Sequence, residues 1–219
     1  MSIVGAAVTT IARSSMVVKP NRGRSRHGVL SVLPVVILAC GLLPALAQAQ
    51  FSQQAKLVGT DSIGSPNQGV SVALSGDGNT AIVGGPGDDS NGAAWVFSRA
   101  GGAWRQQAKL VDTTVEVSQF SAQQGGSVAL SGDGNTAIVG GPLDNQAAGA
   151  AWVYTRSAGV WSQQAKLVGT EAIGSAAQGT SVALSDDGNT AIVGGPNDNF
   201  GAGRVGVHAL GRGRRIPRR

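Results

Sequence analysis

The aspartates of this chain are the residues whose type and spacing could support metal binding or acid/base catalysis. One set lies in three similar turns, Ser75–Asn79, Ser131–Asn135 and Ser185–Asn189. A second set follows further along each time, as Asp88 with Asp89, Asp144 with Asn145, and Asp198 with Asn199. Carboxylates in short loops can hold calcium, and paired carboxylates can serve as acid and base.

We predict neither use for these aspartates. Calcium takes about six to eight oxygen ligands, whereas each turn supplies only one or two carboxylates. Asp77 and Asp133 are therefore interpreted as ordinary turn residues, and the Asp88–Asp89 type of pair as solvated loop residues. The prediction is no metal ligand and no cofactor, with calcium kept as the alternative.

The repeats lack the side chains that nucleophilic catalysis usually requires. The two histidines are His27, ahead of the repeated region, and His208, behind it, so the repeats cannot assemble a Ser-His-Asp triad. Cys40 is the single cysteine and lies in the predicted leader, which leaves neither a thiol nucleophile nor a disulfide. We predict no catalytic residue. The tryptophans recur at repeat positions and are expected to pack between sheets instead of stacking on sugars: Trp95, Trp104, Trp152 and Trp161.

The chain repeats one unit in tandem. GNTAIVGGP occurs at Gly78–Pro86, Gly134–Pro142 and Gly188–Pro196, and the repeat period is near 54 to 57 residues. The flanking segments that recur are SVALS at Ser71, Ser127 and Ser181, QQAKLV at Gln53, Gln106 and Gln163, and AAWV at Ala93 and Ala150. Copies of one supersecondary unit at such a period are typical of stacked architectures.

Each repeat contains four short apolar runs separated by turn residues, a pattern that predicts a four-stranded antiparallel sheet. In the first copy the runs are Val70–Leu74, Thr80–Gly84, Ala93–Ser98 and Ala103–Val111. The second run is apolar on both faces and should be central, whereas the polar fourth run should be an exposed edge. Small residues on one face of the first run, Ser71 and Ala73, would let a neighbouring sheet approach closely.

These features resemble FG-GAP repeats of the bacterial secreted type, which are related to the propeller of integrin α-chains. The resemblance covers Phe51 to Gly203, and it rests on the Ser-Val-Ala-Leu-Ser and Ile-Val-Gly-Gly-Pro runs, on Asp88-Asp89 and on the Trp95–Phe97 strand. It implies an all-β fold of propeller blades more than it implies a ligand. Integrin blades often hold calcium in an Asp-x-Asp-x-Asp-Gly loop, and the turns of this chain depart from that pattern.

The number of repeats is too small for a closed ring. Propellers have about four to eight blades, and this sequence contains two complete copies and part of a third. Phe51–Val58 has the sequence of a fourth strand and precedes any first strand, as in a propeller whose opening strand completes its last blade. The predicted fold is all-β, with tandem four-stranded antiparallel blades of a β-propeller type, incomplete at about two and a half blades. An open stack of sheets and a β-solenoid are the alternatives.

Residues 1–49 are predicted to be a signal peptide. A basic leader precedes the apolar stretch Val29–Ala47, which two prolines interrupt, and an Ala-Gln-Ala cleavage pattern ends at Ala49. Cleavage between Ala49 and Gln50 would leave a mature chain that is secreted, periplasmic or on the cell surface. An uncleaved transmembrane anchor and lipid attachment at Cys40 are the alternatives.

The net charge of +5 gives a misleading impression of the partners. Five basic residues precede the repeats and six follow Gly203. All twelve acidic residues lie between Asp61 and Asp198, and the repeat region 50–203 contains only six basic ones. The repeat region thus carries a net charge of −6, and we predict no nucleic-acid partner. We expect a protein or glycan partner, no stable membrane span after removal of the signal, and self-association through exposed blade edges.

The third repeat departs from the other two after Gly203. We predict three domains, namely a signal at 1–49, repeats at 50–203 (51–104, 105–161 and 162–203), and a basic, disordered tail at 204–219. A back-translation of Arg204–Gly213, read one base later, encodes Ala-Trp-Val-Tyr-Thr-Arg-Ser-Gly-Gly, which matches Ala151–Gly159 at all but one position. We infer a frameshift near Gly203, with a genuine basic tail in which Val205 and Val207 form a makeshift strand as the alternative.

Together these features predict an exported, non-catalytic repeat module that binds a protein or glycan at the cell surface or outside the cell. One alternative is a fragment of a propeller hydrolase whose active residues lie in further blades. The other is a purely structural surface repeat protein.

Resequencing the locus tests the frameshift. We expect the DNA downstream of the Gly203 codon to encode further repeats in the shifted frame, because the agreement with Ala151–Gly159 extends over successive codons. Downstream DNA without repeats in that frame would contradict the hypothesis.

Overall fold

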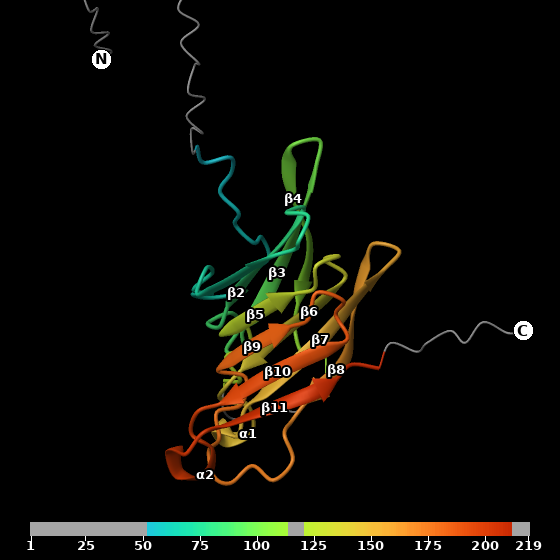
Figure 1. Cartoon of the computed structure of the whole chain (residues 1–219). Helices are drawn as coiled ribbons and strands as arrows, with labels where there is room; N and C mark the ends of the chain where they lie inside the picture. The colour runs from blue at the N-terminus through green and yellow to red at the C-terminus, as the bar shows by residue number, and fades with distance from the viewer. Residues whose placement is uncertain (1–51, 114–120, 212–219) are drawn as a thin grey trace, which may run out of the picture. The chain divides into compact units, whose positions relative to one another are not determined.

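Three antiparallel sheets follow one another along the chain (Figure 1). The computed structural model describes residues 52–113 and 121–211. Two sheets have four strands and the third has three, each paired in the order of a simple meander. The prediction of tandem antiparallel blades is therefore confirmed.

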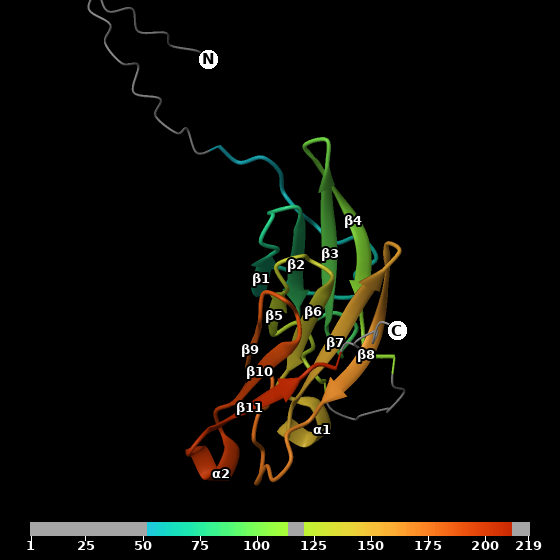
Figure 2. The ribbon, with the colours of Figure 1, turned by 45° about the vertical axis from the view of Figure 1, so that its right-hand side comes forward.

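Strand bounds agree closely with the apolar runs of the repeat. The first sheet contains β1 (Ser71–Leu74), β2 (Thr80–Gly85), β3 (Ala93–Ala100) and β4 (Ala103–Leu110). The second contains β5 (Ser127–Leu130), β6 (Thr136–Gly141), β7 (Ala150–Ser157) and β8 (Val160–Leu167). The third contains β9 (Ser181–Leu184), β10 (Thr190–Gly195) and β11 (Arg204–Ala209). The β3–β4 and β7–β8 hairpins are the longest, and Figure 2 shows them side by side.

Two four-residue turns, α1 (Asp144–Ala147) and α2 (Asp198–Gly201), follow β6 and β10. Each contains three successive residues with positive φ, namely residues 145–147 in α1 and 199–201 in α2. These turns connect the second strand of a sheet to its third and lie at one end of the sheets (Figure 1).

The predicted disorder of the C-terminal tail is wrong for Arg204–Ala209, which form β11. Gly206 lies opposite Val193 in this pairing, as Trp95 lies opposite Val83 in the first sheet. The open edge of β10 accepts the strand because Val205 and Val207 suit an extended backbone. The frameshift and the domain boundary after Gly203 stay predictions.

Ser52–Val58 was predicted to be a strand, and the structure shows no strand there. Its sequence is that of a fourth strand, yet it has no strand partner in the part of the chain that the structure describes. A β-strand requires a neighbour to receive its backbone hydrogen bonds, so the sequence alone could not place this one.

Adjacent sheets meet backbone to backbone through their first two strands. β1 lies beside β5, and β5 lies beside β9. A Cβ atom on Gly84 would overlap the carbonyl oxygen of Gly125, which lies just before β5, and the Ser71 hydroxyl donates to that same oxygen at 2.8 Å. The second junction repeats this arrangement with Gly140, Gly179 and Ser127. The small residues of the first strand therefore have the role predicted for them.

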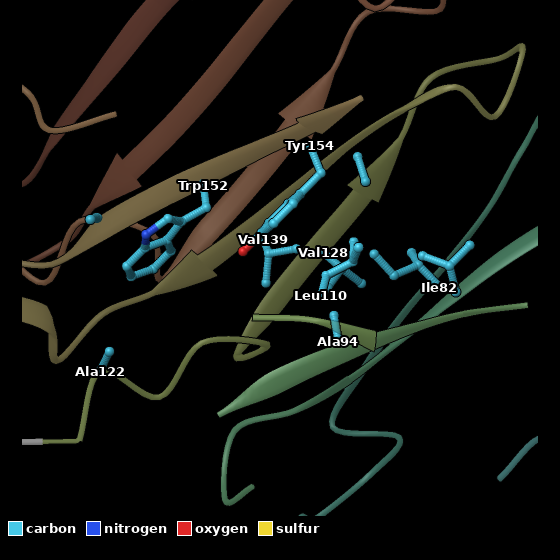
Figure 3. Close-up of a cluster of buried hydrophobic side chains, with 11 residues drawn as sticks. Ile82, Ala94, Leu110, Ala122, Val128, Val139, Trp152 and Tyr154 are labelled. Atoms are coloured by element: carbon cyan, nitrogen blue, oxygen red, sulfur yellow. The ribbon is translucent and has the colours of Figure 1, made fainter. Parts of the chain in front are cut away.

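The hydrophobic core lies between the sheets. Ile82 and Leu110 of the first sheet belong to one buried cluster with Val128, Val139 and Trp152 of the second (Figure 3). A second cluster joins the second sheet to the third in the same way. β2 and β6 are buried along their whole length, as predicted, because a neighbouring element covers each face.

The signal peptide, its cleavage site at Ala49 and Gln50, and residues 212–219 lie outside the described residues, so these predictions remain as they were. In the described ranges, no helix is long and apolar enough to cross a membrane.

Candidate functional site

The first set of aspartates stabilises the hairpin between the first and second strands. Asp77 Oδ1 accepts hydrogen bonds from the Ser75 hydroxyl at 2.6 Å and from the Asn79 backbone N–H at 2.9 Å. These bonds, that of Ser75 first, lower the pKa of Asp77 to about 2. The same contacts recur around Asp133 and Asp187. The interpretation of Asp77 and Asp133 as turn residues agrees with this geometry.

The second set of aspartates corrects an expectation, because one member of each pair is buried. The exposed fraction is 1% for Asp88, 7% for Asp144 and 4% for Asp198. The following residue of each pair is exposed: Asp89, Asn145 and Asn199. The predicted solvation is wrong for the first members, since each loop turns that carboxylate toward a cation of its own sheet.

Asp88 is bound from two sides. The Ile63 backbone N–H donates to Oδ1 at 2.7 Å, and the Lys109 ammonium pairs with Oδ2 at 2.6 Å. The ammonium also donates to the Asp61 carbonyl at 2.9 Å and lies 5.5 Å from the centroid of the Trp95 ring, within cation–π range. The sheet itself aligns these groups, because β3 places Trp95 directly opposite Lys109 in β4.

The Trp-Lys-Asp unit recurs in the second sheet and is incomplete in the third. Lys166 pairs with Asp144 at 2.9 Å and lies 5.1 Å from the ring centroid of Trp152. Asp198 keeps the backbone N–H of Ile173, at 2.8 Å, but its cation is Arg204, whose Nε lies 3.6 Å away. The third sheet thus has the carboxylate without the lysine and without the tryptophan.

A cavity of about 310 Å³ lies between the first and second sheets at the end where these units sit. Its lining includes both ion pairs and the exposed loop residues Asp89 and Asn91. Four aspartates and two lysines line the cavity, so its wall carries an excess of negative charge. Lys109 pairs with Asp88, whereas Lys166 pairs with Asp144 and also lies 4.0 Å from Asp112. The cavity can therefore receive hydroxyl groups or a cation.

Gln124 and Tyr154 form a buried polar pair at the same junction. Gln124 Oε1 accepts from the Asp112 backbone N–H at 3.0 Å, and its Nε2 donates to the Tyr154 hydroxyl at 2.7 Å. Burial raises the pKa of Tyr154, which keeps the phenol neutral near pH 7. The site offers hydrogen bonds and fixed charges, not an ionised nucleophile.

One of the four tryptophans, Trp152, is packed between two sheets as predicted. Trp95 is also fully buried, but it packs within the first sheet and against Leu57, and Trp104 and Trp161 are half-buried at the outer hairpins. Arg99 lies 5.5 Å from the ring centroid of Trp104, and the equivalent arginine covers Trp161. These outer rings are cation–π partners on the sheet edge.

Sequence reasoning missed Lys109, Lys166 and Gln124. A signal was present in the sequence, because a lysine stands in every QQAKLV copy of an otherwise uncharged stretch. Pairing each of these lysines with the tryptophan of the preceding strand would have required the register of the hairpin. In the described part of the chain, no group of three or more His, Cys, Asp or Glu side chains is placed to hold a metal ion.

Comparison with protein families matches residues 51–97 to the FG-GAP repeat, which confirms the resemblance noted in the sequence. The matched segment begins in the unpaired fourth-strand sequence and ends in β3, so the family unit is out of phase with the sheet. A search of curated proteins found none that matches.

Among solved structures, the fold resembles TolB from Acinetobacter baumannii, with 14% identity, a TM-score of 0.37, and coverage of 65% of this chain and 30% of that one. It also resembles Kuenenia stuttgartiensis hydrazine synthase, with 18% identity, a TM-score of 0.44, and coverage of 74% of this chain and 37% of that one. This chain spans about a third of the length of either structure.

Removal of the Lys109 ammonium should destabilise the first sheet. We expect Lys109→Met to lower the free energy of unfolding by about 3 kcal/mol, because the buried Asp88 carboxylate loses its counter-charge. Urea unfolding followed by far-ultraviolet circular dichroism measures the change.

Arg105→Met is the matched control, since Arg105 is an exposed cation on the same strand. Its unfolding midpoint should stay almost unchanged. Equal midpoints for the two variants would show that the Lys109–Asp88 pair contributes nothing.

Proposed function

We propose that this chain of FG-GAP repeats is an exported, non-catalytic module that binds a protein or glycan at the cell surface or outside the cell. The observation that carries the proposal is the polar cavity between the first two sheets, with its excess of carboxylates. Loops held by a rigid sheet scaffold are common binding sites.

The chemistry of the cavity favours a ligand rich in hydroxyl groups or carrying a cation. Asp88 and Asp144 are engaged by lysines and act as the rigid wall, while Asp89 and Asn91 reach solvent. A sugar offers hydroxyl donors to such carboxylate and amide oxygens, and a lysine side chain offers an ammonium.

Phe200 in α2 supports a contact surface on the same end of the sheets. Its side chain is 90% exposed, on a residue whose φ of 58° is unusual for a bulky side chain. It also lines an open cavity of about 560 Å³ with Ile173 and Asn197. Exposed aromatic rings on loops are favourable partners for a protein surface or a sugar face.

Export is part of the proposal because of the predicted leader at residues 1–49. The FG-GAP repeat, which the resemblance connects with secreted and surface proteins, supports the same location. A hydrolase would require catalytic residues in further blades, and the described cavities supply no observation in favour of that alternative.

Isothermal titration of the full chain, purified after export, tests the proposal. The probes are a panel of neutral oligosaccharides and an oligolysine peptide. We expect one probe class to bind, and Asp89→Ala to weaken that binding by about tenfold, equivalent to about 1.4 kcal/mol. Glu171→Ala, at an exposed acid outside the cavity, should bind like the unchanged chain. Absence of heat with both probes, or equal loss in both variants, would refute the cavity as the site.

A further inference from the structure

Each junction between neighbouring sheets has two sides. The outer face of the first sheet carries the residues of one side, and the outer face of the third sheet carries those of the other. At an inner junction, Ile82 of one sheet and Val128 of the next are both buried. The equivalents on the outer faces are exposed, at 67% for Val72 on the first sheet and 43% for Ile192 on the third. Each outer face is therefore shaped for a sheet that the described residues do not supply.

The glycines of the junction are repeated on these outer faces. Gly84 makes its close approach to Gly125, and their equivalents at the two ends are Gly194 and Gly69. A Cβ on Gly69 would meet open space, and one on Gly194 would clash only with the Ser181 hydroxyl and touch the Ser181 carbonyl oxygen at 3.7 Å. Gly69 has a φ of +95°, which itself favours glycine, whereas Gly194 has no such φ and is the position that a close backbone neighbour would explain.

Ser52–Val58 occupies the place of a fourth strand belonging to a sheet ahead of the first. Arg99 Nη1 donates to Gln54 Oε1 at 3.2 Å, just as Arg156 Nη1 donates to Gln107 Oε1 of β4 at 2.9 Å. Leu57 packs on the cluster around Trp95, as Leu110 packs on the cluster around Trp152. The segment is a fourth strand without its sheet.

In the described part of the chain, the third sheet lacks the fourth strand that the other two sheets have. Its edge strand β11 pairs only with β10 among the described residues. In the other two sheets the equivalent aspartate pairs with a lysine of the fourth strand, and that lysine belongs to the QQAKLV sequence. Asp198 has no such lysine in the described ranges. The matching lysine at the start of the chain is Lys56.

We propose that two copies of this chain associate head to tail, so that residues 53–57 of each copy pair with β11 of its partner. Val72 and Leu74 of one copy would then cover the exposed face of the partner's third sheet. The three described sheets of each chain would give six in the pair, within the range of about four to eight blades in closed propellers. This assembly goes beyond the binding function proposed above, and it concerns the chain in which Arg204–Ala209 form β11.

The register of the exchanged strand follows from the two complete sheets. Ala108 lies opposite Val96, and Ala165 lies opposite Val153. Ala55 is therefore expected opposite Val207 of the partner. Lys56 would then point toward the partner's Asp198, as Lys109 points toward Asp88 and Lys166 toward Asp144.

Disulfide trapping tests the exchange directly. The variant Ala55→Cys with Val207→Cys is made in a Cys40→Ser background, because Cys40 is the chain's single cysteine. Both positions are exposed, so the substitutions should not prevent folding. Oxidation of the full chain, purified after export, is expected to give mainly a covalent dimer on non-reducing gels.

The control pairs Ala55→Cys with His208→Cys, since consecutive strand residues point to opposite faces. Because side chains alternate between the two faces of a strand, we expect this control to give at least about tenfold less dimer. Three results would overturn the proposal, namely a product that stays monomeric, an intrachain bond, or a ladder of longer oligomers. Equal dimer yields in both pairs would overturn it as well, because they would indicate collision without register.

Discussion

Backbone contact between neighbouring sheets is the constraint on which the rest of this structure depends. At Gly84 and Gly140 the second strand touches a carbonyl group of the next sheet, and no side chain would fit. That approach brings isoleucine and valine side chains of facing strands into one core and fixes the spacing of the loops at the sheet ends. Sheets of such short strands have little core of their own, so each depends on a neighbour.

The sequence was sufficient to predict the strands and insufficient to predict the site. Alternation and the glycine-asparagine turns are local signals, and they placed β2 and β3 within two residues of their observed bounds. The Lys109–Asp88 pair depends on the register of a hairpin, and an acidic pair in a glycine-rich loop gives no local sign of burial. A strand at Val205 and Val207 was only the alternative prediction for a similar reason, since the open edge of β10 determines the structure of β11 more than its own residues do.

Binding and assembly use different parts of the same junction. The cavity between the first two sheets exists because their loops are held apart at one end while their inner strands touch. A junction between copies would place Lys56 near Asp198 and would repeat the ion pair that forms the wall of that cavity. Among the described residues no lysine lies beside Asp198, which pairs with Arg204 instead. This absence and the exposed valines of the outer faces would then have one explanation, an interface whose second half belongs to another copy.

Sedimentation equilibrium of Gly194→Ala beside the unchanged chain tests this account most directly. Within the chain an added Cβ clashes only with the Ser181 hydroxyl, which can rotate away, but it would block the backbone of an approaching sheet. The account predicts a dimer for the unchanged chain and a monomer with the same circular dichroism spectrum for the variant. A variant that dimerises as well as the unchanged chain, or an unchanged chain that is monomeric, would contradict it.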